Sequence, residues 1–289
     1  MTSRCQDLSS EEWSEPPLCR AYTLVAFDAG WVQLSNTQTV PSAQLQWGIG
    51  LLPNLSLELL GVWVCSPVHH PSPAPPAGAD SQAARAAPGP LVQSTGYRIE
   101  RLARRGVEVI GFATAGDSAG FGASLRRVFP ETVVLPSLAR LVATTLSRVA
   151  PRHRARLMAS LREILHSDCG ASARVALGSM ASSTMGRTYP ADVDVWRRTL
   201  ERAWILWRLD APLRREVLSG DSVAVEASQS LRRSIARHGP FRDEESATSF
   251  VRAVLQRVID GSSRKVMAAV TEPNQHPDAL GPRISALGV

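Results

Sequence analysis

The residue with the clearest chemical potential is an aspartate inside an apolar stretch. Asp28 stands in the run Leu24-Val-Ala-Phe-Asp-Ala-Gly, whose composition is typical of a buried strand. Aspartate is depleted in strands, and an unpaired buried carboxylate is costly, so Asp28 needs either hydrogen bonds or a cation. Asp28 is therefore a candidate ligand for a cation, although for this residue alone a hydrogen-bonded or strand-end aspartate is the more common explanation.

Two further acids are candidates because of their positions. Asp117 follows the fourth predicted strand, a place that suits a functional site and also an ordinary turn. Glu226 is expected on a helix capped by Asp221 or Ser222. The residues that share its helical face, at spacings of four, seven and eleven, are Ser230, Arg233 and Arg237. Such spacing usually marks a solvated Glu–Arg face, so these acids form a site only if the fold brings them together.

A different chemistry is suggested by the segment Gly116-Asp117-Ser118-Ala119-Gly120. It has the form Gly-x-Ser-x-Gly and lies between a predicted strand and a predicted helix, like the nucleophile elbow of an α/β-hydrolase. That fold needs later strands to present an acid and then a histidine, whereas the chain after Leu135 is predicted to be helical. A serine hydrolase acting through Ser118 is therefore the weaker alternative.

The elements that must position these residues begin with closely spaced strands, which predict an antiparallel meander. These strands are expected at Thr23–Leu34, Gln44–Leu51 and Ser56–Val64. Residues 1–20 are polar and are expected to form a flexible arm. Residues 66–92 are rich in Pro, Ala and Gly and are expected to form a loop.

The second half of the chain changes character from mixed to helical. The expected α/β stretch comprises a helix at Tyr97–Arg105, strands at Val107–Thr114 and Glu131–Leu135, and a helix at Gly122–Val128. After Ser137 apolar residues recur every three or four positions, which indicates helices. The later helices are expected at Val195–Trp207, Val223–Arg237 and Glu244–Ile259. Strands followed by α/β and then by helices predict an α+β fold.

Composition and charge narrow the class of protein. The chain has 289 residues and a formal net charge of +6, and Lys265 is its only lysine, so arginine carries the charge. Arginine suits phosphate oxygens, which favours nucleic acid as a partner, although a GC-rich gene would also replace Lys by Arg. The four cysteines form no Cys-x-x-Cys pair, which argues against a zinc ribbon or a disulfide framework. The sequence shows neither a signal peptide nor an apolar run of membrane-spanning length, so we expect a cytoplasmic protein without a membrane partner.

An ordered series of short motifs runs along most of the chain. The series opens with Phe27-Asp28-Ala-Gly-Trp-Val, Trp47-Gly-Ile-Gly and Leu57-Glu-Leu-Leu-Gly-Val-Trp-Val. It continues with Arg105-Gly106-Val107, Gly120-Phe121, Val128-Phe129-Pro130, Tyr189-Pro190, Leu209-Asp210-x-Pro212, Glu226 and Gly239-x-Phe241, which precedes the helix Glu244–Leu255. Each piece is weak alone, but the ordered series is specific and spans about residues 20 to 265. It resembles the catalytic domain of Mutator-type bacterial insertion-sequence transposases.

The resemblance implies an RNase H-like mixed sheet and a DDE-type site, in which two Asp and one Glu hold divalent metal ions at the DNA backbone. Asp28 and Glu226 match the first and third acids, and Asp117 is the candidate second acid. The implied cofactor is Mg²⁺ or Mn²⁺, because such ions prefer oxygen ligands and can promote in-line attack on phosphorus. The arginines expected near phosphates are Arg232, Arg233 and Arg237.

The implied domain organisation follows the same resemblance. Residues 21–136 would form the RNase H-like core, 137–220 a helical insertion, 221–265 the helices that complete the core, and 266–289 a disordered tail. The implied partner is the DNA of the insertion-element ends. A second copy of the chain, in a homo-oligomer, is a further partner that the resemblance allows.

Departures from the family pattern predict an impaired enzyme. The family has Asp-Gly-x-x-Gly-Phe, which puts Gly116 where the second Asp belongs and Asp117 one residue late; in a strand that slip reverses the side chain. The family's Gln-x-Cys-x-x-His stretch appears here as Leu135-Pro-Ser137-Leu-Ala-Arg140, and its Asn after the Glu is Gln229. The alternative to a transposase with a degraded site is a remnant that binds DNA, or assists assembly, without catalysis.

Overall fold

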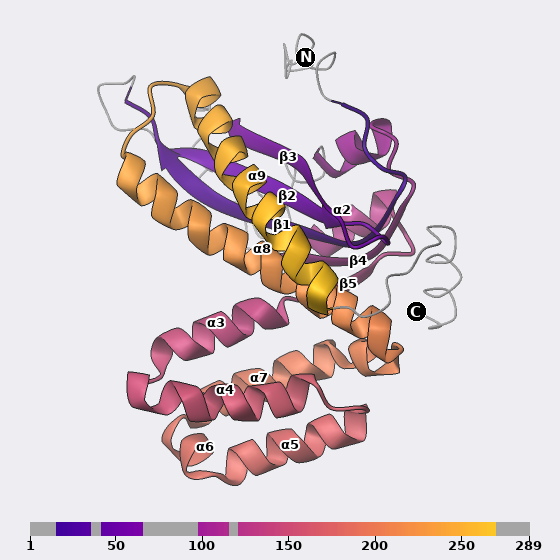
Figure 1. The fold of residues 1–289 in the computed structure, drawn as a ribbon, viewed down its shortest axis with the longest axis vertical. Helices are drawn as coiled ribbons and strands as arrows, with labels where there is room; N and C mark the ends of the chain where they lie inside the picture. The colour runs from indigo at the N-terminus through magenta and orange to yellow at the C-terminus, as the bar shows by residue number, and fades with distance from the viewer. Residues whose placement is uncertain (1–15, 36–41, 66–97, 116–120, 270–289) are drawn as a thin grey trace, which may run out of the picture.

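The computed structural model describes residues 16–35, 42–65, 98–115 and 121–269, and its centre is a five-stranded mixed sheet (Figure 1). The strands are β1 (Ala21–Gln33), β2 (Ser42–Leu51), β3 (Leu57–Cys65), β4 (Val109–Ala115) and β5 (Val133–Pro136). Their order is β3-β2-β1-β4-β5. The first three strands pair antiparallel, and β4 pairs parallel with β1 and with β5. The predicted meander and the α+β class are therefore confirmed.

Helices cover both faces of this sheet. The side chains of β1 alternate between the two faces, so both faces present apolar side chains on which helices pack. Phe27 points to one face, where its ring lies 5.2 Å from that of Phe121 at the start of α2 (Phe121–Val128). Residues 98–104 are helical and pack in the same apolar cluster as α2. Leu24 points to the other face, where α8 (Ala211–His238) approaches so closely at Gly220 that a Cβ there would lie 2.8 Å from Leu24 Cδ2.

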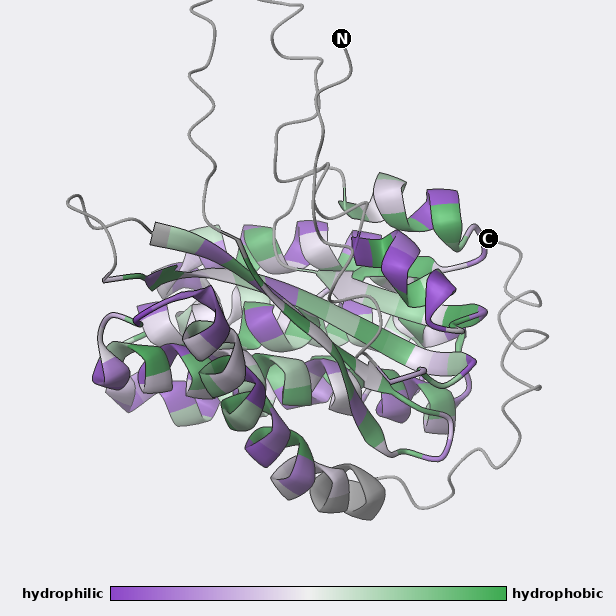
Figure 2. Cartoon of the chain, turned by 90° about the horizontal axis from the view of Figure 1, so that it is seen from above, coloured by the Kyte–Doolittle hydropathy of each residue, from purple (hydrophilic) through white to green (hydrophobic). Residues whose placement is uncertain are grey.

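The helix α9 (Glu244–Ala269) runs beside α8 over the antiparallel part of the sheet (Figure 1). The two helices and β1 to β3 share one buried apolar cluster. Figure 2 shows hydrophobic residues concentrated along the strands and hydrophilic residues on the outer sides of the helices. Among the described residues, we find no helix with both the length and the apolar character needed to cross a membrane.

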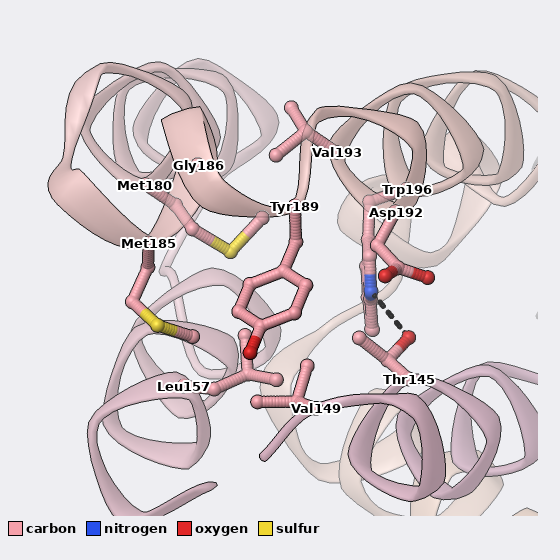
Figure 3. A pocket seen from close by; sticks show the side chains of 10 residues that line it. All are labelled: Thr145, Val149, Leu157, Met180, Met185, Gly186, Tyr189, Asp192, Val193 and Trp196. Carbon is pink, nitrogen blue, oxygen red and sulfur yellow. Dashed lines mark hydrogen bonds between the residues drawn. The ribbon is translucent and has the colours of Figure 1, made fainter. Parts of the chain in front are cut away.

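A block of helices follows β5 and precedes α8 in the chain. It extends away from the sheet (Figure 1). Its members are α3 (Leu138–Arg148), α4 (Pro151–Leu165), α5 (Gly170–Ser182), α6 (Thr184–Thr188), α7 (Pro190–Arg202) and the 3-10 helix η2 (Trp204–Arg208). Trp196 is fully buried in it and donates from Nε1 to Thr145 Oγ1 at 3.1 Å (Figure 3). The surrounding side chains leave a cavity of only about 10 Å³, too little for a ligand larger than water.

Two predicted helices differ from the structure. The Trp-rich helix expected at Val195–Trp207 is divided, because α7 ends at Arg202 and a 3-10 turn follows. The helix expected at Val223–Arg237 begins twelve residues earlier, at Ala211, where Asp210 is the N-cap and accepts from Leu213 N at 2.8 Å. The expected cap at Asp221 or Ser222 is therefore wrong, and both residues lie inside α8.

Candidate functional site

Asp28 lies on the face of β1 that is covered by α8, at the end where β1 and β4 stop pairing. The last described pair between these strands is Phe27 with Ala115. Its carboxylate accepts three hydrogen bonds. Oδ1 accepts from Ala29 N at 2.9 Å, and Oδ2 accepts from Arg140 Nη2 at 2.6 Å and from Ser228 Oγ at 2.5 Å. The compensation that a carboxylate in an apolar strand requires is thus supplied by protein groups.

The cation beside Asp28 is the guanidinium of Arg140, which comes from the first turn of α3. Two acceptors hold this turn in place. Ser137 is the N-cap and accepts from Arg140 N at 3.1 Å, while Asp221 Oδ2 accepts from Ala139 N at 2.8 Å. The Asp28 side chain is 7% exposed and that of Arg140 30% exposed, so their attraction is less screened than that of a surface pair.

Asp221 is a second buried acid beside this ion pair. Burial raises the pKa of Asp221, and hydrogen bonding from Ala139 N–H, the hydroxyls of Ser137 and Thr114, and the charge of Arg140 oppose that rise. Its Oδ1 has no geometrically good donor among the described residues. We name Asp28, Arg140, Asp221 and Ser228 the Asp28 cluster. It joins β1, α3 and α8. In the sequence, Asp28 is 112 residues from Arg140 and 200 residues from Ser228.

Glu226 leaves α8 on a different side from the Asp28 cluster. It is exposed, and it lines an open depression between α8 and α9 together with Ser230, Arg257 and Ser262. Ser228, which does reach Asp28, is two residues further along, or about 200° around the helix. The expected convergence of the Asp28 and Glu226 carboxyl groups on one pocket is not found, because α8 turns its Ser228 side toward the sheet.

The other predicted site residues have separate positions. Asp117, together with the whole segment 116–120 of the hydrolase alternative, lies outside the described residues. Arg232, Arg233 and Arg237 are exposed near the carboxyl end of α8, and Arg233 Nε donates to Gln229 O at 3.3 Å. Within residues 16–35, 42–65, 98–115 and 121–269, no group of three His, Cys, Asp or Glu side chains could hold a metal ion.

The sequence interpretation missed Arg140 and Ser228 as partners of Asp28. One signal was present, since Arg140 stands where the resemblance places a histidine in the Gln-x-Cys-x-x-His stretch. Nothing in the local sequence of α8 distinguished Ser228 from its neighbours. Asp221 was noticed only as a cap, and its helix-interior position makes it a buried partner of α3 instead.

Comparison with known proteins gives concordant matches. The chain is 25% identical over 278 residues to the transposase for insertion sequence element ISRM3 of Rhizobium meliloti, covering 94% of this chain and 62% of that protein. A probable transposase for an insertion sequence element of Corynebacterium diphtheriae is 23% identical over 235 residues, covering 81% of this chain and 62% of that protein. The chain therefore spans less than two thirds of the length of these relatives.

A solved structure, the Drosophila P element transposase strand transfer complex, is 11% identical and covers 97% of this chain and 73% of its own, with a TM-score of 0.25. That score is too low to support any conclusion. The sequence model of the Mutator family of transposases, in contrast, matches residues 97–262, which is more than half of the chain. Together with the insertion-element relatives, this match shows that the chain belongs to the Mutator family of transposases.

Proposed function

We propose that this protein binds DNA as a derivative of an insertion-element transposase, with an RNase H-like fold and a DDE-type site that no longer cleaves and joins DNA strands efficiently. The observation that carries the proposal is the state of Asp28. Its Oδ2 is taken by Arg140 and Ser228, while Glu226 lines a depression on another side of α8.

The sheet supports the RNase H-like part of the proposal. Three antiparallel strands are followed by two parallel ones, and Asp28 lies on the central strand of the five. The helical block lies between β5 and α8, which is where the resemblance implies an insertion between the second and third acids. Asp28, the proposed first acid, lies on this sheet, although its surroundings differ from those of a metal ligand.

The charge distribution supports DNA as the partner. Between Leu138 and Asp210 the sequence has twelve arginines against six acidic residues, which leaves +6, the formal net charge of the whole chain. All of these arginines except Arg140 are exposed. Arg232, Arg233 and Arg237 add a further exposed group on α8. Exposed arginines can neutralise phosphates and release counterions, so binding should weaken steeply as salt rises.

The family's metal chemistry does not fit the described residues. Mg²⁺ or Mn²⁺ requires several oxygen ligands, and Asp28 already holds the permanent cation of Arg140 against one of its two carboxylate oxygens. No other acidic side chain of the described ranges completes a ligand set with it. We therefore assign no step of strand cleavage to a metal ion at this site.

The test uses purified protein, a labelled duplex carrying the inverted-repeat ends that flank the element, and Mg²⁺ or Mn²⁺. We expect salt-sensitive binding without nicking above that of the Asp28→Ala variant. Metal-dependent nicking that Asp28→Ala abolishes would refute the impairment and leave a working transposase. Absence of salt-sensitive binding to any duplex would refute the DNA-binding role. Hydrolysis of an ester substrate that Ser118→Ala removes would favour the hydrolase alternative.

A further inference from the structure

We propose that Arg140 supplies Asp28 with an internal cation in the place of a metal ion, so that a former ligand of the site now clamps the helical block to the sheet. The inference rests on the proposed descent from a DDE-type site. It does not require the protein to bind DNA.

Protein donors occupy Oδ2 of Asp28. A carboxylate oxygen has two lone pairs, and those of Oδ2 accept from Arg140 Nη2 at 2.6 Å and Ser228 Oγ at 2.5 Å. A metal ion could bind this oxygen only if one of these donors left. Both hydrogen bonds are charge-assisted, because the acceptor is a carboxylate, and such bonds are stronger than neutral ones, which makes that exchange unfavourable.

The cation at Asp28 carries a permanent charge. A guanidinium does not lose its charge in proteins, so Arg140 would repel a divalent ion at Asp28 at any working pH. Histidine, which the resemblance places at this position, can be neutral near pH 7 and would not repel an ion in this way. The Arg at position 140 therefore opposes a metal site in two ways, because it occupies Oδ2 of Asp28 and brings a competing positive charge.

The first turn of α3 is anchored, so that Arg140 stays at Asp28. Asp221 and Ser137 accept the N–H groups of the first turn, and Leu138 is buried beside them. If this end of α3 moved, the buried Asp221 carboxyl group would lose the hydrogen bond from Ala139 N or become exposed to solvent. Asp28, Arg140 and Ser228 thus connect the first strand, the helical block and α8 in one polar contact.

The test is a double-mutant cycle on thermal unfolding, made with the full chain and without DNA. The variants are Arg140→Gln, Asp28→Asn and both together. Removing one partner leaves the other unpaired, so each single variant should melt roughly 5 °C or more below the parent. The double variant should lose clearly less than the sum of the single losses. The matched control is the more exposed pair of Arg148, on the same helix α3, with Asp192 of α7, whose cycle should show little coupling.

Asp28→Asn also separates the alternatives by direction. An isolated acid of a vacant metal site is costly when buried, so its replacement by Asn should raise the melting temperature; a paired acid gives a fall. Millimolar Mn²⁺ should leave the melting temperature of the parent unchanged. A ligand stabilises only the state that it binds, and by this inference the folded state does not bind Mn²⁺ at Asp28. Additive cycles, a higher melting temperature for Asp28→Asn, or an Asp28-dependent rise with Mn²⁺ would each overturn the inference. If Arg140→Gln fails to fold, the Asp28→Asn and Mn²⁺ comparisons, which leave Arg140 in place, still decide between the alternatives.

Discussion

Exposed arginines of α8 should contribute measurably to DNA binding. The perturbation is the triple replacement of Arg232, Arg233 and Arg237 by glutamine, which removes three positive charges from the solvent side of the helix. The sheet-facing side of α8, with Ala227, Ser228 and Leu231, is left intact, so the fold should survive. Glutamine keeps the helix propensity of the segment close to that of arginine.

The size of the effect follows from the number of charges removed. Each neutralised phosphate adds about 0.9 to the slope of log affinity against log salt, so three contacts contribute about 2.7. Over a fourfold rise in salt, from about 50 to about 200 mM, the parent should lose roughly 40-fold more affinity than the triple variant.

The assay is fluorescence anisotropy of a labelled duplex titrated at several KCl concentrations. The control replaces Arg126 and Arg127 of α2, exposed residues that lie on the opposite face of the sheet from α8. The control should retain the slope of the parent. An unchanged slope in the triple variant, or an equal fall in the control, would refute the assignment of this surface.

Three further predictions concern stability. Trp196→Ala should cost about 3–5 kcal/mol of unfolding free energy in urea titrations, whereas Trp196→Phe should cost far less, since Thr145 keeps its bond to Leu141 O. Because the pKa of Asp221 is raised above 3.8 in the folded protein, the folded state binds the proton more tightly, and stability should fall as pH rises above that value. Asp221→Asn should lack this component of the pH dependence, and a pH profile identical to that of the parent would contradict it. Gly239→Ala should destabilise by about 1 kcal/mol, because Gly239 ends α8 with a φ of 79°; a melting temperature equal to that of the parent would count against it.

Local pattern was sufficient to locate the strands and most of the helices. The apolar runs predicted β1, β2 and β3 to within two residues at each end, because a strand buried on one or both faces must carry apolar side chains along its whole length. The start of α8 was missed for a local reason. Asp221 and Ser222 resemble caps, but Asp210 followed by Pro212 provides the actual start and leaves them inside the helix.

The sequence by itself determined the family, the class of the fold, and the burial of Asp28 in a strand that demands a partner. Only the tertiary structure decided which residues pair with the Asp28 carboxylate. A helix repeats every 3.6 residues, so its sequence leaves open which of several faces packs on the sheet. The close approach of α8 to the sheet at Gly220 sets the rotation of this helix. With this rotation Ser228 donates to Asp28, and Glu226 lies toward α9. Arg140 reaches Asp28 across 112 residues because β5 and the anchored first turn of α3 bring it there, and contacts of that separation leave no local pattern in the chain.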